Sequence, residues 1–343
     1  MNGATHYRPP RWLRNPHLQS VLSTSSLRRQ RGLRALVASG AVNHVHVLDV
    51  GKGVRLQGCH SYLPERRSRA LALLLHGWEG STESSYMRMT AAQLLRHGFE
   101  IFRLNFRDHG DTHHLNPGLF HSGLLDEVAD AAATIVQQFS VETLVVAGFS
   151  LGGNFALRLA LRAEPAGLPL KRVAAICPLI NPSTAVTNAR HGGLYDWYFR
   201  SKWRASLVRK RELFPELHDY DDATLAQDTR GLMASIALRE GFESLEEYFD
   251  CYTIADDRLM GLKVPAHILM AEDDPVIPVS DFQDWRLPGS VQLEIAECGG
   301  HCGFIVNASG DGFAERWIAQ KLKKAIRSDS QREHGKLSAL QAT

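Results

Sequence analysis

One serine, set between a predicted strand and a predicted helix, constrains this 343-residue chain more than any other feature. Residues 143–147 are apolar and rich in β-branched side chains, which is typical of a parallel strand buried on both faces. Residues 155–163 are rich in Leu, Ala and Arg, which favour a helix. Between them stands Gly148-Phe149-Ser150-Leu151-Gly152. Because glycines let a strand and a helix approach closely, this turn can present the Ser150 hydroxyl as a nucleophile.

The five-residue pattern also has a plainer explanation, a turn that merely joins a strand to a helix. A serine hydroxyl is a weak nucleophile at neutral pH and needs an adjacent base, which an acid must orient. Asp273-Asp274-Pro275 follows a predicted strand at 266–270, and His301 follows another at 291–295. Both positions lie just past strand ends, where open α/β sheets place their sites. We therefore predict His301 as the general base and Asp274 as the acid, with Asp273 as the alternative acid.

Two backbone amides are the candidates for stabilising the negative charge that forms on an attacked carbonyl oxygen. Such charge is best held by donors that the fold positions in advance. One candidate is the N–H of Leu151, directly after the serine. The other is the N–H of Trp78, in the loop after the apolar strand 70–75. These two donors are the predicted oxyanion hole, and the indole of Trp78 is expected to line the acyl pocket.

Apolar strands alternate with helical segments along much of the chain, which predicts a mostly parallel, doubly wound sheet. Alternating polarity at 43–50 and 54–62 predicts a hairpin before the first parallel strand. Residues 180–258 break the alternation and are rich in aromatic side chains. The predicted organisation is an irregular N-terminal segment packed on the core (1–40), a core (41–179 and 259–327), a helical lid insertion (180–258) and a frayed tail (328–343).

Composition excludes several classes of function. The net charge of +2 gives no indication of nucleic-acid binding. No apolar run approaches the roughly 18 residues of a transmembrane helix. The five cysteines are odd in number and widely spread, which does not suit a disulfide framework, so we expect a cytoplasmic protein.

The first 48 residues hold arginines and no acidic residue. This segment would suit an organelle transit peptide or peripheral contact with an anionic membrane. The alternative is an ordinary basic surface.

The sequence holds two further groups of reactive side chains. The segment 108–121 holds several His and Asp residues, but their spacing does not match a metal site, so we expect hydrogen bonding within a long loop and no metal. Cys298 and Cys302 flank His301, yet their spacing is not that of the Cys-x-x-Cys redox motif. We expect both thiols to be small packing residues.

Taken together, these motifs resemble the α/β-hydrolase superfamily over about residues 70–325. The segments Arg14-Asn15-Pro16-His17-Leu18-Gln19-Ser20 and His76-Gly77-Trp78-Glu79-Gly80 narrow the resemblance to its YheT-like branch, which includes the EMB8-type plant proteins. The resemblance implies an α/β-hydrolase fold with Ser150, Asp274 and His301 as the triad. It also argues against a cleaved transit peptide, because it implies that the N-terminal motif belongs to the mature fold. At 108–112 the chain departs from the branch, so substrate preference does not carry over.

The function predicted from these residues is a serine hydrolase that cleaves acyl or lipid-type carboxylic esters through an acyl-enzyme. It needs no cofactor, and its partner is a small-molecule ester. Two alternatives stay open: an acyltransferase or thioesterase on the same triad, and a non-catalytic binding protein with a hydrolase fold.

Overall fold

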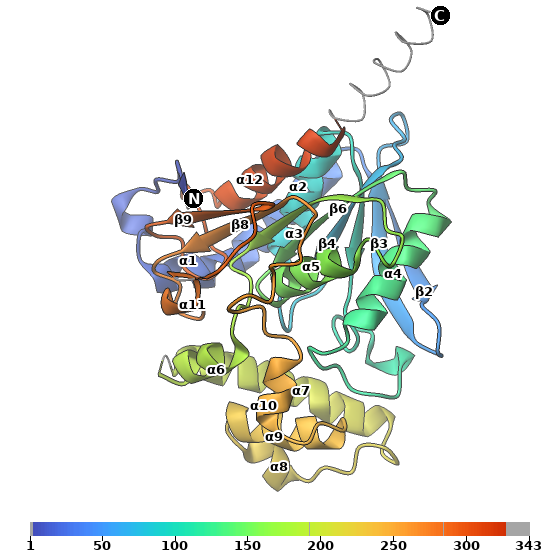
Figure 1. Cartoon of the computed structure of the whole chain (residues 1–343), viewed down its shortest axis with the longest axis vertical. Coiled ribbons are helices and arrows are strands. Elements are labelled where there is room, and N and C mark those ends of the chain that lie inside the picture. Colours follow the sequence, from blue (N-terminus) through green and yellow to red (C-terminus); the bar gives the residue numbers. More distant parts are fainter. Residues whose placement is uncertain (1–2, 192, 284, 327–343) are drawn as a thin grey trace, which may run out of the picture.

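The centre of the molecule is one sheet. The computed structural model describes residues 3–191, 193–283 and 285–326, and within them nine strands run in the order β1-β9-β8-β7-β6-β4-β5-β3-β2. Neighbouring strands are parallel except in the β2/β3 and β3/β5 pairs. The strands are β1 (Gly3–Ala4), β2 (Val42–Asp49), β3 (Arg55–Tyr62), β4 (Ala70–Leu75), β5 (Glu100–Leu104), β6 (Thr143–Phe149), β7 (Leu170–Ile176), β8 (Ala266–Ala271) and β9 (Val291–Ala296) (Figure 1).

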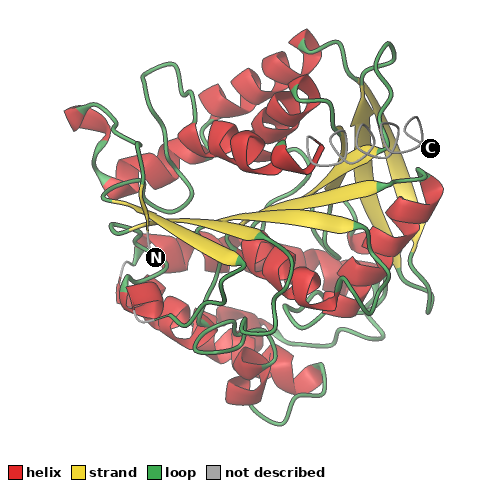
Figure 2. Ribbon diagram, turned by 45° about the horizontal axis from the view of Figure 1, so that its top comes forward, coloured by secondary structure: helices red, strands yellow, loops and turns green. Residues whose placement is uncertain are grey.

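Alternate residues of the central strands enter two different cores. In β4, Leu71, Leu73 and Leu75 pack with residues of α4 (Leu125–Gln138) and α5 (Leu151–Arg162). Ala72 and Leu74 of the same strand pack with residues of α3 (Ser85–Arg96) and α12 (Phe313–Leu322). Helices therefore cover both faces of the twisted sheet (Figure 2). The predicted doubly wound, mostly parallel fold is confirmed.

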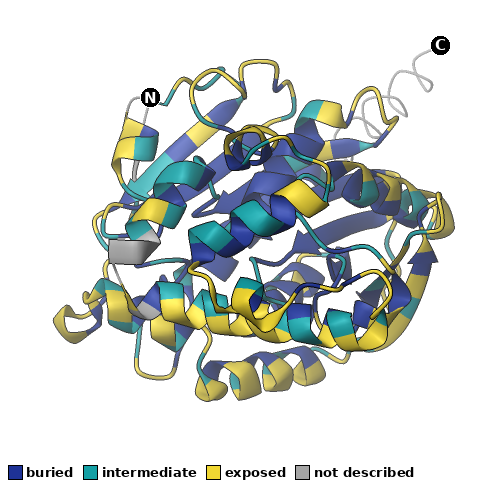
Figure 3. Ribbon diagram, turned by 90° about the horizontal axis from the view of Figure 1, so that it is seen from below, coloured by how far each residue is buried: buried dark blue, intermediate teal, exposed yellow. Residues whose placement is uncertain are grey.

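A set of helices stands between β7 and β8 in the chain. They are α6 (Pro182–His191), α7 (Leu194–Leu213), α8 (Asp222–Ala226), α9 (Thr229–Arg239) and α10 (Leu245–Asp250). Their buried aromatic side chains, among them Trp203, Tyr248 and Phe249, belong to the same core as the face of the sheet below α4 and α5. The helices lie beyond one edge of the sheet, with exposed residues on their outer surfaces (Figures 1 and 3). A short α11 (Ser280–Gln283) follows β8.

The N-terminal segment, which we expected to be irregular, is largely helical. It contains a 3-10 turn (Arg11–Leu13), α1 (Pro16–Ser23) and α2 (Ser26–Ala38). Proline at the first position of a helix stabilises it rather than breaking it, and Asn15 caps α1 by accepting a hydrogen bond from the Leu18 N–H at 3.0 Å. Pro16 thus marks where α1 begins, and Pro10 stands directly before the 3-10 turn.

Some arginines of this segment form ion pairs with residues of the fold. Arg28 of α2 is buried and pairs with Glu315 of α12, and Arg31 pairs with Asp311. These ion pairs hold α2 against the helices that cover one face of the sheet. Among the described residues no helix is both long and apolar enough to cross a membrane. The predicted tail from residue 328 onward lies outside the described residues.

We predict that Arg28→Met lowers the free energy of unfolding by about 3 kcal/mol, because it leaves the buried Glu315 carboxylate without its cation. Arg29→Met on the same helix is the matched control, since Arg29 is exposed, and it should change stability by less than about 0.5 kcal/mol. Urea unfolding of the three proteins measures both values. Equal effects of the two substitutions would contradict the role given to the Arg28–Glu315 pair.

Candidate active site

Ser150 occupies a strained turn between β6 and α5. Its φ is 52° and its ψ is −120°, a conformation that residues other than glycine rarely adopt. The Ser150 N–H donates to the Ile176 carbonyl at 2.9 Å, which ties the turn to β7. A Cβ atom at Gly148 would lie 2.1 Å from the Gly152 carbonyl oxygen, and one at Gly152 would lie 2.3 Å from the Leu75 oxygen. No other residue fits at either position, so the glycines allow the turn that exposes the hydroxyl.

His301 connects this serine to an acid. Its Nε2 lies 2.9 Å from Ser150 Oγ, and its Nδ1 lies 2.9 and 3.1 Å from the two carboxylate oxygens of Asp274. The three side chains come from the ends of β6, β8 and β9. With Nδ1–H donating to the carboxylate, Nε2 is free to accept the serine proton.

The two neighbouring aspartates have different partners. Asp274 is buried, and its Oδ1 accepts hydrogen bonds from the N–H groups of Val276 and Ile277 at 2.8 and 3.0 Å. This local turn aims the carboxylate at the imidazole. Asp273 instead accepts the Gly300 N–H at 2.9 Å and makes no contact with the His301 ring. The structure thus brings Asp274, not Asp273, to the histidine, while Asp273 holds the loop that carries it.

The surroundings of His301 stabilise the protonated form that arises when Nε2 accepts a proton. Burial by itself lowers the pKa of the imidazole, but the negative charge and hydrogen bond of Asp274, with a smaller contribution from Cys302, raise the pKa to about 9. The nearby His76 is different: burial lowers its pKa to about 4, and its Nε2 accepts the Phe106 N–H at 3.2 Å. His76 is therefore a neutral group that braces the loop.

The two predicted oxyanion donors lie next to the serine. Within the described residues, the backbone N–H groups of Leu151 and Trp78 donate to no other group of the protein. A Cβ atom at Gly77 would come within 3.3 Å of the Ser150 Cβ, so the loop before Trp78 lies against the serine. Two unengaged amides beside a hydroxyl can bind an oxygen atom that carries negative charge.

Two cavities meet at Ser150. The larger, of about 430 Å³, is lined by Ser150 and His301 together with side chains from α1 and α7. The smaller, of about 100 Å³, is lined by Ser150 and Leu151 and by apolar side chains of α6, α9 and α10. Trp78 and Phe199 line both, with their rings stacked at a centroid distance of 5.6 Å. The serine therefore has mostly apolar space on two sides.

Sequence reasoning missed the residues that hold the His301 loop from the N-terminal segment. Ser20 Oγ accepts the His301 N–H at 2.8 Å, and Gln19 Oε1 accepts the Ile305 N–H at 2.8 Å. His17 Nδ1 lies 2.9 Å from the hydroxyl of Tyr195 on α7. All three belong to the N-terminal motif that carried the family resemblance, so the motif was a signal, but its partners are distant in sequence.

The His/Asp-rich segment 108–121 docks the helical insertion. The ammonium of Lys210 on α7 is buried and donates to Asp108 Oδ1 at 2.6 Å and to the carbonyls of His113 and Asn116 at 3.2 and 2.5 Å. His113 Nε2 lies 2.7 Å from Ser206 Oγ, also on α7. The side chains of this segment point to separate partners rather than to one common ligand.

The cysteines near His301 differ in burial. Cys302 is buried and Cys298 is half-buried. All five cysteines are free thiols. The sulfur of Cys302 lies close to Cys177, at the end of β7, rather than to Cys298.

Comparison with known proteins places the chain among related sequences. Residues 72–316 match the family described as Alpha/beta hydrolase family. The esterase-like protein YheT of Escherichia coli (strain K12) is 23% identical over 244 residues, which cover 68% of this chain and 70% of YheT. The embryogenesis-associated protein EMB8 of Picea glauca is 23% identical over 248 residues, which cover 68% of this chain and only 53% of EMB8. These relatives agree with the resemblance found in the sequence.

A solved structure has a similar fold. The esterase Pf2001 of Pyrococcus furiosus superimposes with a TM-score of 0.57 and 14% identity, covering 85% of this chain and 92% of that one. At this level of identity the likeness concerns the fold.

We predict that the ring of His301 titrates near pH 9, as followed by NMR of histidine-labelled protein and assigned with His301→Gln. Asp274→Asn removes the attracting charge, so burial dominates and the pKa should fall below the ordinary 6.5. Asp273→Asn is the matched control and should leave the pKa raised. Since the folded-state pKa lies above the unfolded one, this contribution to stability is complete below pH 6.5 and is lost as the pH rises through about 9. A lowered pKa in Asp273→Asn alone would reverse the two assignments.

Proposed function

Since this chain belongs to the alpha/beta hydrolase family, we propose that it is a serine esterase that hydrolyses lipid-type carboxylic esters through Ser150, His301 and Asp274. One observation carries the proposal: a continuous hydrogen-bonded chain, from Asp274 through His301 to Ser150, ends at a hydroxyl between two cavities. A hydroxyl, a base and an acid in this arrangement are the parts that acyl transfer requires.

The first half of the reaction forms the acyl-enzyme. Ser150 Oγ attacks the ester carbonyl carbon while His301 Nε2 takes the hydroxyl proton. The carbonyl oxygen becomes negative and accepts hydrogen bonds from the N–H groups of Leu151 and Trp78. The C–O bond to the alcohol then breaks, and the imidazolium gives its proton to the departing alkoxide. Asp274 stabilises the imidazolium while it exists.

The second half releases the acid. A water molecule attacks the acyl carbon as His301 removes one of its protons, and the same two amides hold the oxyanion. Collapse of the intermediate breaks the bond to Ser150 Oγ, which regains a proton from His301. All groups return to their starting states, so the cycle uses one ester and one water and gives an acid and an alcohol.

The two cavities support a substrate with apolar parts on both sides of the ester. The smaller one is lined by Leu179, Ala185 and Met233, among other apolar groups, and would take an acyl chain of modest length. The larger one carries Arg29, Glu79 and Lys202 among its lining residues, and would take a bulkier alcohol with a polar end. This division matches an amphiphilic ester better than a small polar one.

We predict that a fluorophosphonate probe labels the native protein and that Ser150→Ala abolishes labelling, because the probe phosphonylates an activated serine. Ser122→Ala is the matched control: Ser122 lines the smaller cavity without contacting His301, so labelling should persist. Labelling is read by mass spectrometry of the modified peptide. Undiminished labelling of Ser150→Ala would disprove the assignment, provided that circular dichroism shows both variants folded.

We also predict that the smaller cavity sets the acyl-chain preference. In a series of p-nitrophenyl esters, Ala185→Leu should lower kcat/KM for the octanoate about tenfold while changing the acetate less than about twofold, because the added methyl groups occupy the space of the chain end. The control is Ala205→Leu, which lies exposed on α7 and lines neither cavity. Equal loss on both esters would show that the acyl chain lies elsewhere.

A further inference from the structure

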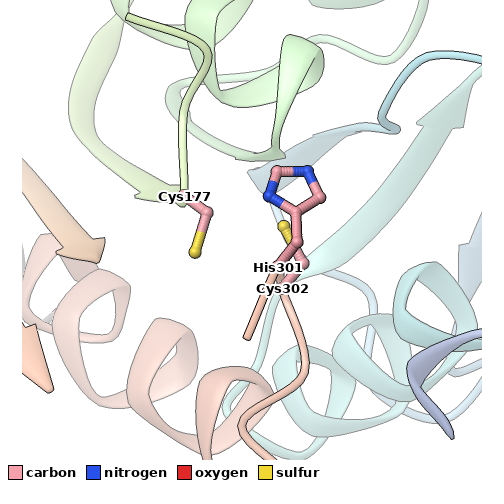
Figure 4. Close-up of side chains that lie close together, drawn as sticks. All are labelled: Cys177, His301 and Cys302. Atoms are coloured by element: carbon pink, nitrogen blue, oxygen red, sulfur yellow. The ribbon is translucent and has the colours of Figure 1, made fainter. Parts of the chain in front are cut away.

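Two cysteine thiols lie beside the proposed base, and the mechanism above uses neither. Among the residues that the structure describes, Cys177 Sγ, Cys302 Sγ and a ring nitrogen of His301 all lie within 4.8 Å of one another. Cys177 follows β7, and the other two residues belong to the loop after β9 (Figure 4). Two strand ends far apart in sequence therefore bring two sulfurs and one nitrogen to the same place.

The backbone holds both cysteines in an unfavourable conformation. Cys177 has a φ of 41° and Cys302 a φ of 59°, in the left-handed region where glycine is preferred. The Cys177 N–H donates to the Leu269 carbonyl at 2.8 Å, which fixes that residue against β8. Strain of this kind persists only where the surrounding structure imposes it, and it is common at functional sites.

Neither sulfur has a strong partner. Cys177 Sγ lies 3.9 Å from the Gly300 carbonyl, and Cys302 Sγ lies 3.6 Å from the Ile176 carbonyl, so both contacts are weak thiol hydrogen bonds. Two of the three groups can be reached by a small solute, because Cys302 and His301 line the larger cavity, whereas Cys177 is buried. Packing alone does not require a thiol at both positions.

We propose that Cys177, Cys302 and His301 form an inhibitory site for a soft divalent metal ion, for which Zn²⁺ is the best match. Two thiolates and one imidazole are a ligand set that zinc prefers, and a fourth position stays open for water. Bond lengths of about 2.3 Å to sulfur and about 2.0 Å to nitrogen place tetrahedral ligands roughly 3.5–4 Å apart. The ligand atoms of the cluster lie within 4.8 Å of one another, at most about 1 Å wider than that spacing, so ligation would draw them together.

Binding and the proposed catalysis exclude one another. The metal forms bonds to two sulfurs, whose protons pass to solvent, and accepts the lone pair of one imidazole nitrogen. Nδ1 of His301 contacts Asp274 and Nε2 contacts Ser150, so coordination through either nitrogen breaks one link of the triad. The inhibitory consequence rests on the proposed esterase function, whereas the metal site itself does not.

The first test measures inhibition. Zn²⁺ should inhibit hydrolysis of p-nitrophenyl butanoate by the full chain, and a chelator should restore activity. Cys177→Ser should keep the activity but raise the half-inhibitory Zn²⁺ concentration at least about tenfold, because it lacks one ligand. Cys302→Ala, which lacks the other sulfur ligand, should raise the half-inhibitory concentration to a similar degree when each measurement is referred to that variant's own rate without metal. Cys298→Ser, a half-buried thiol in the same loop, is the matched control and should behave like the native protein.

The second test does not depend on activity. Co²⁺ should bind the native chain and Ser150→Ala with one ion per chain and a thiolate-to-metal absorption band, and Cys177→Ser should lose the band. If the absorption band appears and the chain has no esterase activity, the metal site is supported and the proposed function is wrong. Esterase activity with no band, or inhibition by Zn²⁺ that is equal in the native chain and in both cysteine variants, would overturn the metal site. Inhibition that a phosphine reductant reverses and a chelator does not would also overturn it, in favour of a Cys177–Cys302 disulfide.

Discussion

The close backbone contact between the serine turn and the end of β4 is the constraint on which the rest of the site depends. The carbonyl oxygens of Leu75 and His76 lie 2.3 and 2.4 Å from the position that a Cβ atom at Gly152 would take. This contact brings the first turn of α5 against the loop that carries Trp78. It thereby sets the distance between the serine and the Trp78 N–H, and any side chain at Gly152 would separate them.

The strand order explains how the remaining groups meet. The strands β6, β7, β8 and β9 are neighbours and parallel, so their carboxyl ends lie along one edge of the sheet. Ser150, Cys177, Asp274 and His301 follow these four strands in turn. The same topology that assembles the proposed triad therefore also places a thiol in the middle of it, between the serine strand and the aspartate strand.

Much of this arrangement was predictable from sequence because it is local. The apolar runs define the central strands, and the residues after them are the site residues, so Ser150, Asp274 and His301 could be named. The contacts of α1 could not be predicted, because Ser20 and His301 are joined only by tertiary packing. The helical N-terminal segment, which we expected to be irregular, begins α1 with Pro16, and proline is favourable at the first position of a helix. The sequence favoured Asp274 over Asp273, and the structure supplies the physical reason: the N–H groups of Val276 and Ile277 hold the Asp274 carboxylate in the turn that faces the imidazole.

The buried Lys210–Asp108 pair has a consequence for how a substrate enters. The ammonium has three oxygen partners, all in the segment 108–116, and no exposure to solvent. Swinging α7 away from the sheet would separate a buried charge pair, at a cost of about 3–5 kcal/mol if the charges stay unpaired. The pair therefore fastens α7 to the segment 108–116 and opposes such a movement. The proposed route to the serine is the larger cavity, whose lining residues Val21 of α1 and Trp197 of α7 are exposed, so the N-terminal helix forms one side of its opening.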